Sequence, residues 1–236
     1  DEVFREVESG NAHYGVVPIE NSSEGMISNA LDSFHTSELL VCGEVAMCIH
    51  HSLLLKSETV DTVSRIYSHP QSLAQCRTWL DNRFPKAERV AVSSNAEAVH
   101  RVAQEHDMTV AAIASDMAAA LYGLHVAYKN IEDQPNKTTR FLIIGHSSVS
   151  ASDKDKTSLL VLVHNKPGAL YHILEPFYRY EISLTSIESF PCGEDLRCYI
   201  DFEGHCDQPK VQQLMQDLQQ GTIELRMLGS YPQAVL

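Results

Sequence analysis

Three polar side chains, Thr138, Thr139 and Arg140, directly precede an apolar run that predicts a buried strand. Hydroxyl groups donate hydrogen bonds, and a guanidinium can bind a carboxylate through two parallel N–H···O bonds. Arg140 could equally lock its strand to a neighbouring glutamate, and the residues alone favour neither role. This stretch is therefore a candidate site whose chemistry depends on what the rest of the chain places around it.

A second set of candidates lies where strand-like segments end in serine or asparagine and a helix follows. Asn21, Ser68, Ser94 and Ser115 stand at such junctions. Each helix start offers unpaired N–H groups and a partial positive charge, so several at one sheet edge form an anion site without lysine. Alternatively, each residue only caps its helix and contributes about 1 kcal/mol. For Ser68, Gln71 would complete the capping box.

The composition narrows the function classes. A net charge of −13 over 236 residues argues against a nucleic-acid partner and requires local positive charge or N–H groups for any anionic ligand. The six cysteines form no C-x-x-C pair and the twelve histidines no H-E-x-x-H motif, so we expect reduced thiols and no metal site. No run of about 18 apolar residues predicts a membrane span. A cytoplasmic protein is expected.

The elements that must position these residues alternate between strands and helices. Residues 14–20 read as a strand, 39–55 as a long strand-like run, and 64–80 as a strand that leads into a helix. This order predicts an α/β region with helices on a mostly parallel sheet. The chain starts within an apparent helix that ends at Gly10 and does not begin with Met, so we expect that upstream sequence precedes it.

A polar linker at residues 146–156 separates this region from a second pattern. The second pattern runs strand, helix, strand, strand, helix, strand, which predicts an α+β ferredoxin-like (βαββαβ) unit. Its helices should cover one face of the sheet and leave the other free to meet a partner. We therefore expect two domains, residues 1–150 and residues 157–236.

Specific motifs make the chain resemble prephenate dehydratase with a carboxyl-terminal ACT regulatory domain. The motifs are GVVPIENSSEG (15–25), YSHPQSLAQC (67–76), AAIAS…LYGL (111–124), NKTTRF (136–141), PGAL (167–170) and ESFP (188–191). Any one of them alone would be weak. In this order they span nearly the whole chain, which makes the resemblance strong.

The resemblance implies an enzyme that converts prephenate to phenylpyruvate, with loss of carbon dioxide and water and without a cofactor. It implies a two-lobed fold like that of periplasmic binding proteins, with the active site in the cleft between the lobes. The family's opening strand and Gly-Pro-x-Gly-Thr-Phe loop are missing, so the first lobe is expected to be incomplete and the chain inactive or weak. Some members carry an upstream chorismate mutase domain, for which this sequence leaves room.

Four residues match positions of the family's active site. Thr139 corresponds to the threonine most closely tied to catalysis, and Asn21, Ser68 and Gln75 match polar residues of the site. Arg140 follows Thr139 and is included as a candidate. A threonine hydroxyl is a very weak acid, so we expect Thr139 to stabilise the departing hydroxide by a hydrogen bond. Cys76 is expected in the core.

The resemblance also implies an effector site for L-phenylalanine between paired ACT domains, in a homodimer or tetramer. The candidate residues are Asn165, Gly168, Ala169, Leu170, Glu188 and Ser189. Phe190 stands where the family has arginine, which leaves that residue's role open. In the alternative interpretation, Phe190 is an apolar interface residue.

Two other functions fit the same pattern. One is a non-catalytic amino-acid-sensing or binding protein, which would not need Thr139, Asn21, Ser68 and Gln75 together. The other is a dimerisation fragment in which only the ACT pair is intact. An assay of prephenate turnover beside calorimetry with phenylalanine separates the three.

Overall fold

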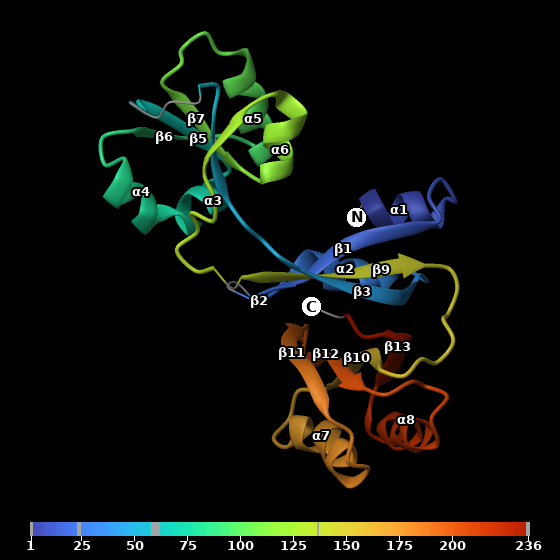
Figure 1. The fold of residues 1–236 in the computed structure, drawn as a ribbon. Helices are drawn as coiled ribbons and strands as arrows, with labels where there is room; N and C mark the ends of the chain where they lie inside the picture. Colours follow the sequence, from blue (N-terminus) through green and yellow to red (C-terminus); the bar gives the residue numbers. More distant parts are fainter. Residues whose placement is uncertain (1, 23–24, 58–61, 136, 235–236) are drawn as a thin grey trace. The chain divides into compact units, whose positions relative to one another are not determined.

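The computed structural model describes residues 2–22, 25–57, 62–135 and 137–234. Its chain forms two compact units (Figure 1), a discontinuous unit of Asp1–Met47 with Thr138–Leu236 and an inserted unit of Cys48–Lys137. Within the described ranges, no helix combines the length and the apolar character that crossing a bilayer requires.

The inserted unit is a five-stranded mixed sheet with helices. Its strand order is β6-β5-β7-β4-β8. The strands are β4 (Ser52–Leu55), β5 (Arg65–Ser68), β6 (Glu88–Ala91), β7 (Val110–Ala114) and β8 (His125–Tyr128), and the helices are α3 (Pro70–Gln75), α4 (Arg77–Arg83), α5 (Asn95–Gln104) and α6 (Asp116–Tyr122). β5 is parallel to β6 and β7, but β4 is antiparallel to β7 and β8. The expected parallel sheet is therefore correct for only part of this unit.

The amino-terminal part of the discontinuous unit is a small sheet with two helices. Its elements are α1 (Glu2–Glu8), β1 (Tyr14–Asn21), β2 (Gly25–Met26), α2 (Ser28–Thr36), β3 (Leu40–Cys48) and β9 (Thr138–Gly145). The strand order is β2-β1-β9-β3, and β9 returns antiparallel to β1. The strand-like run 39–55 is divided into β3 and β4, which belong to different sheets. Asn136, the first residue of the NKTTRF motif, lies outside the described residues.

The carboxyl-terminal part has the predicted βαββαβ order. Its elements are β10 (Asp155–His164), α7 (Ala169–Arg179), β11 (Leu184–Cys192), β12 (Asp195–Glu203), α8 (Pro209–Gly221) and β13 (Glu224–Pro232). The order β11-β12-β10-β13, with every neighbouring pair antiparallel, is the split-βαβ arrangement. One face of this sheet packs against α7 and α8 through a core that includes Val161, Ile173, Ile200 and Leu214.

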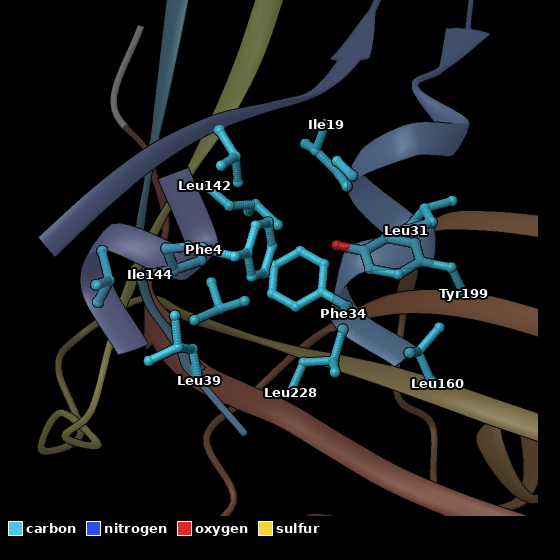
Figure 2. Close-up of a cluster of buried hydrophobic side chains, with 14 of the residues drawn as sticks. Phe4, Ile19, Leu31, Phe34, Leu39, Leu142, Ile144, Leu160, Tyr199 and Leu228 are labelled. Atoms are coloured by element: carbon cyan, nitrogen blue, oxygen red, sulfur yellow. The ribbon is translucent and has the colours of Figure 1, made fainter. Parts of the chain in front are cut away.

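The other face of this sheet is covered, which corrects the expectation of a free face. Leu160, Tyr199, Leu228 and Tyr231 share one buried cluster with residues of α1, α2, β1 and β9. Figure 2 shows Phe4 and Phe34 at the centre of this cluster. Their rings pack edge to face, with the ring centroids 5.0 Å apart. The sequence suggested a free face because Tyr199 and Asp201 alternate with apolar residues and read as solvent-facing. Both are in fact fully buried.

The helix starts confirm some of the expected caps and contradict others. Ser94 caps α5 by accepting the Glu97 N–H at 3.0 Å. Ser68 does not cap α3, because it is still the last residue of β5 and the chain turns one residue later, at His69. There the imidazole Nδ1 of His69 accepts the N–H of Gln71 at 3.3 Å. Ser115 occupies the N-cap position of α6 without a side-chain cap bond.

Candidate active site and effector region

Asn21 and Thr139 are 118 residues apart in sequence and are brought together by the β1–β9 pairing. Asn21 is the last residue of β1 and Thr139 the second residue of β9, and the two are cross-strand partners. Asn21 Nδ2 donates to Thr139 Oγ1 at 3.2 Å. Because the hydroxyl accepts in this bond, its own proton is left to donate elsewhere. The side chain of Thr139 is held mostly out of water, at 8% exposure, where hydrogen bonds are stronger than in bulk solvent.

The residues next to this pair, Ser22 and Thr138, are joined by a backbone hydrogen bond and a side-chain hydrogen bond. Ser22 N–H donates to the carbonyl of Thr138 at 3.0 Å, and the Ser22 hydroxyl accepts the Thr138 N–H at 3.0 Å. These two bonds hold the end of β1 and the start of β9 together beside the Asn21–Thr139 hydrogen bond.

Arg140 links its strand to neighbouring glutamates, which is the second of the two roles considered for it. Its guanidinium lies 2.6 Å from Asp201, 3.1 Å from Glu44 and 3.2 Å from Glu20, measured nitrogen to oxygen. Burial alone would lower the pKa of Arg140, but Asp201 and Glu44 hold that pKa above its usual value. Arg140 donates hydrogen bonds to Glu20 and Glu44 and forms an ion pair with Asp201, so it acts as a structural cation.

Ser68 lies at the carboxyl end of β5 and is fully buried. Its hydroxyl contacts Asn95 Oδ1 at 2.8 Å and the carbonyl of Ile113 at 3.0 Å. Asn95 also accepts the N–H of His69 and donates to the hydroxyl of Ser72 at 2.9 Å. Asn95 thus holds the start of α3 in place.

Gln75 ends α3 and is oriented by His51. The Gln75 Oε1 atom lies 2.7 Å from His51 Nε2, which requires a proton on Nε2. Glu132 in turn accepts the N–H of His51 at 2.9 Å and contacts His50 Nδ1 at 2.7 Å. Burial would raise the pKa of Glu132, but His50 and the His51 N–H bring it below its usual value.

Asn95, His51 and Glu132 were missed by sequence reasoning. The Ser94–Glu97 capping box placed Asn95 at a helix start, but nothing local indicated that its side chain would reach back to Ser68. His51 belongs to no metal-ligand motif, so nothing in the sequence distinguishes it from the other histidines. Glu132 lies in a polar loop without any recognisable pattern. Only the fold brings these residues to the candidate positions.

Cys76 packs in the core, as expected from the sequence. It is fully buried, and burial together with Asp133 and Glu132 raises the pKa of its thiol to about 12. A thiol with that pKa holds very little thiolate at neutral pH, so a role as nucleophile is unsupported.

One side-chain cluster within the described ranges has the composition of a metal site, His205, Cys206 and Asp207. Both ring nitrogens of His205 already have hydrogen-bond partners. Nε2 donates to the carbonyl of Val149 at 3.1 Å, and Nδ1 accepts the N–H of Asp207 at 3.2 Å. The cluster is therefore better explained as a tether for the turn before α8.

The candidate effector residues lie in two segments of the discontinuous unit. Asn165 and Gly168 are exposed in the turn before α7, and Gly168 has a φ of +87° that favours glycine. Ala169, which follows it, is buried, whereas Leu170 is 40% exposed.

The second effector segment is in β11. Glu188 and Ser189 are exposed and pair with Tyr199 and Cys198 of β12. Phe190 packs against the buried cluster of Figure 2, in agreement with its interpretation as an apolar interface residue.

The comparisons with known proteins agree with these motifs. A family model described as prephenate dehydratase matches residues 1–149. A bifunctional chorismate mutase/prephenate dehydratase of Pseudomonas aeruginosa is 50% identical over 240 residues, covering 100% of this chain. The chain belongs to the prephenate dehydratase family.

Solved structures share the fold of this chain. A prephenate dehydratase of Arthrobacter aurescens in complex with L-Phe is 32% identical, with a TM-score of 0.85, covering 97% of this chain and 77% of that one. GqqA, described as a novel type of quorum quenching acylase, is 27% identical, with a TM-score of 0.87, covering 98% and 86%. The family thus includes the expected two-lobed region and ACT-like region.

This chain spans 65% of the length of the Pseudomonas aeruginosa relative. Asn21 and Thr139 meet within the discontinuous unit. Ser68 and Gln75 belong to the inserted unit, where separate hydrogen-bond partners hold each of them.

Proposed function

We propose that the chain is the dehydratase and regulatory part of an enzyme that converts prephenate to phenylpyruvate. The observation that carries this proposal is the hydrogen bond from Asn21 to Thr139 within a family member. The bond accounts for two motifs, PIEN and TRF, through one arrangement. A protein that only sensed amino acids would not need it.

In this reaction the bond to the ring carboxylate breaks, and its electron pair enters the ring, which becomes aromatic. The ring C–O bond breaks at the same time and its electron pair leaves with the hydroxide. One proton converts that hydroxide to water, so the balance is prephenate dianion plus H⁺ to phenylpyruvate, carbon dioxide and water. The hydroxyl of Thr139 stabilises the departing oxygen, and Asn21 aims that hydroxyl by donating to it.

Ser68 and Gln75 complete the proposed catalytic set. Within the inserted unit, Asn95 holds Ser68 and His51 holds Gln75, so each of these two side chains is oriented before substrate binds. Arg140 is occupied by Asp201, Glu44 and Glu20. The carboxylates of prephenate are therefore assigned to N–H groups at the helix starts that follow β5 and β6.

Residues 157–236 form the proposed regulatory domain and residues 1–150 the catalytic domain. L-Phenylalanine is the proposed effector, bound by Asn165, Gly168, Ala169, Leu170, Glu188 and Ser189 between two copies in a dimer or tetramer. The Arthrobacter aurescens complex with L-Phe supports this assignment. The bifunctional relatives support an upstream chorismate mutase domain, and their biosynthetic role supports a cytoplasmic location.

The hydroxyl of Ser68 gives no support to an acylase. It contacts the Asn95 amide oxygen and a carbonyl oxygen, which orient a hydroxyl but do not act as a general base.

The deciding experiment is an assay of phenylpyruvate formation from prephenate. It is run on the chain alone and on the chain fused to the part of the Pseudomonas aeruginosa relative that it does not match. Turnover by the fusion, with inhibition by L-phenylalanine and binding of it in calorimetry, supports the proposal. Phenylalanine binding without turnover by either form would instead identify a sensing protein.

A further inference from the structure

A network of charged side chains joins β9, which carries Thr139, to the sheet of β10–β13, which we call the ACT sheet. In addition to the three acids at Arg140, Lys156 Nζ lies 2.9 Å from Glu44. The side chains of Asp201 and Glu44 are 0% and 1% exposed, and those of Arg140 and Lys156 are 12% and 11% exposed. We call these residues, with Glu20, the Arg140 network.

Stability alone does not explain this network. Removing charged groups from water costs several kcal/mol per ion, and apolar residues of similar size are often equally good or better. The surrounding surfaces are apolar, since Leu160 and Tyr231 pack on Phe34 and Ile19 in the same interface. A larger apolar core would hold the two sheets together without ions, so the charges at this point call for another role.

The position of the network indicates that role. Arg140 follows Thr139 in β9, and its cross-strand partner Glu20 precedes Asn21 in β1. On the other side, Asp201 of β12 pairs with Ser186 of β11, the strand that carries the candidate effector residue Glu188. The network therefore lies one residue from the catalytic pair and one strand from the effector segment.

Asp201 is held firmly within the ACT sheet. The hydroxyl of Ser158 donates to Asp201 Oδ1 at 2.6 Å and also contacts Tyr231 at 2.6 Å and Tyr199 at 3.2 Å. Tyr199 is the cross-strand partner of Glu188. A displacement of β11 and β12 would thus move Asp201 as part of the sheet rather than be absorbed by a side-chain rotation.

We propose that the Arg140–Asp201 ion pair transmits the state of the ACT sheet to Thr139, which makes Arg140 and Asp201 positioning residues for the dehydratase reaction. This inference depends on the proposed function. Successive residues of a strand are rigidly linked, so a shift of Arg140 also moves Thr139 relative to Asn21. A hydrogen bond of 3.2 Å weakens steeply when it is stretched or tilted, and small misplacements of a catalytic group cost large factors in rate.

The experiment compares Asp201→Asn and Arg140→Lys with the wild type, in whichever form of the enzyme turns over prephenate. Each variant is assayed with and without saturating L-phenylalanine, and phenylalanine binding is measured by calorimetry. Inhibition, which for such couplings is typically about 5- to 150-fold, should fall below about twofold while phenylalanine still binds. In the absence of effector, kcat should fall and KM should stay nearly unchanged, because positioning rather than substrate binding is lost.

Arg226→Lys is the matched control. Arg226 lies in β13 and donates to the carbonyls of Phe34 and Ser37 at the end of α2. It therefore joins the ACT sheet to α2 and, among the described residues, has no hydrogen bond or ion pair to β9. The Arg226→Lys variant should lose some thermal stability but keep its activity and its inhibition by L-phenylalanine. The double variant Arg140→Lys/Asp201→Asn should lose no more inhibition than either single variant.

The outcomes separate this inference from the proposed function. A wild-type protein without turnover contradicts the proposed function. Full inhibition of folded Asp201→Asn or Arg140→Lys, by an enzyme whose wild type turns over, contradicts the coupling alone. Equal loss of inhibition in Arg226→Lys would also contradict the coupling, because any damage to the interface would then abolish inhibition. If circular dichroism shows that Asp201→Asn does not fold, the inhibition of Arg140→Lys alone tests the coupling.

Discussion

Asn21 and Thr139 lie opposite each other at the ends of β1 and β9, and Asn21 Nδ2 donates to Thr139 Oγ1. The direction of this bond matters, because it leaves the threonine proton for a partner outside the pair. The neighbouring residues, Glu20 and Arg140, repeat the cross-strand pairing as an ion pair at 3.2 Å. The proposed catalytic pair and a structural ion pair are thus neighbours on the same two strands.

Replacing Thr139 by valine removes the donor and keeps the shape of the side chain. We expect kcat to fall by about 10²–10³, as for loss of one oxyanion-hole donor, with a small change in KM. Thr139→Ser keeps the hydroxyl and should retain most of the rate. Steady-state kinetics with prephenate test this, and thermal unfolding confirms that both variants are folded. Equal rates for the valine and serine variants would exclude the hydroxyl from the reaction.

Replacing Asn95 by alanine should disturb Ser68 without touching substrate. The change removes the acceptor for Ser68 and for the His69 N–H, and it leaves those donors without their partner. An unsatisfied buried group costs about 1–3 kcal/mol, so the free energy of unfolding should fall by that order, and kcat should fall with it.

Ser94→Ala is the control for Asn95→Ala, because it removes a cap on the same helix without contacting Ser68. We expect it to lower stability by about 1 kcal/mol while kcat is kept. Urea unfolding and kinetics on both variants separate stability from positioning. If both lose kcat equally, Asn95 has no specific effect on Ser68.

Local pattern was sufficient to predict the ACT-like unit, but not the partners of its polar residues. Periodicity in the sequence predicts strands such as β12 and β13 and the apolar faces of α7 and α8. Alternation and helical spacing determine which side chains share a face. Asp201 shows the limit. In a sheet with one covered face it would meet water, and only the packing of α2 and β9 on that face turns it into a buried partner of Arg140.

Ser68 illustrates the same limit within the candidate site. Its residue type and its position before Pro70 satisfy every local criterion for an N-cap. The strand nevertheless runs through Ser68, because β5 continues to pair with β6 there. The hydroxyl then points to Asn95 and Ile113, which are contributed by other elements. A motif could single out Ser68 as a candidate, whereas its hydrogen-bond partners depend on the tertiary fold.

Replacing Gly229 by alanine should weaken the contact between the ACT sheet and β3. A Cβ atom at Gly229 would lie 2.0 Å from the carbonyl oxygen of Val41, which is backbone and cannot rotate away. We expect a loss of at least about 1–3 kcal/mol, the usual cost of overpacking. Gly221→Ala is the control, since a Cβ there meets nothing within 4 Å and lies in α8. Urea unfolding should show a lower midpoint for the first variant only, and equal midpoints would contradict the close approach.

Acid should weaken the Arg140 network through Glu44. Burial would raise the pKa of Glu44, but the Ala234 N–H, Lys156 and Arg140 together bring it below its usual value of 4.5. A carboxyl whose pKa is lowered on folding adds stability that is fully present above the unfolded pKa and is lost as pH falls through the folded pKa. Wild-type stability should therefore fall more steeply below about pH 4.5 than that of Glu44→Gln.

The measurement is the free energy of unfolding of both proteins, from urea titrations at several values between pH 7 and pH 3. At pH 7, Glu44→Gln should be the less stable protein, because it leaves Lys156 and Arg140 with fewer partners. The difference should shrink toward acid, where Glu44 is itself neutral in the wild type. Glu224→Gln, an exposed change in β13, shows how much follows merely from losing one negative charge. A difference that stays constant over the whole range would mean that the ionised form of Glu44 does not hold this interface together.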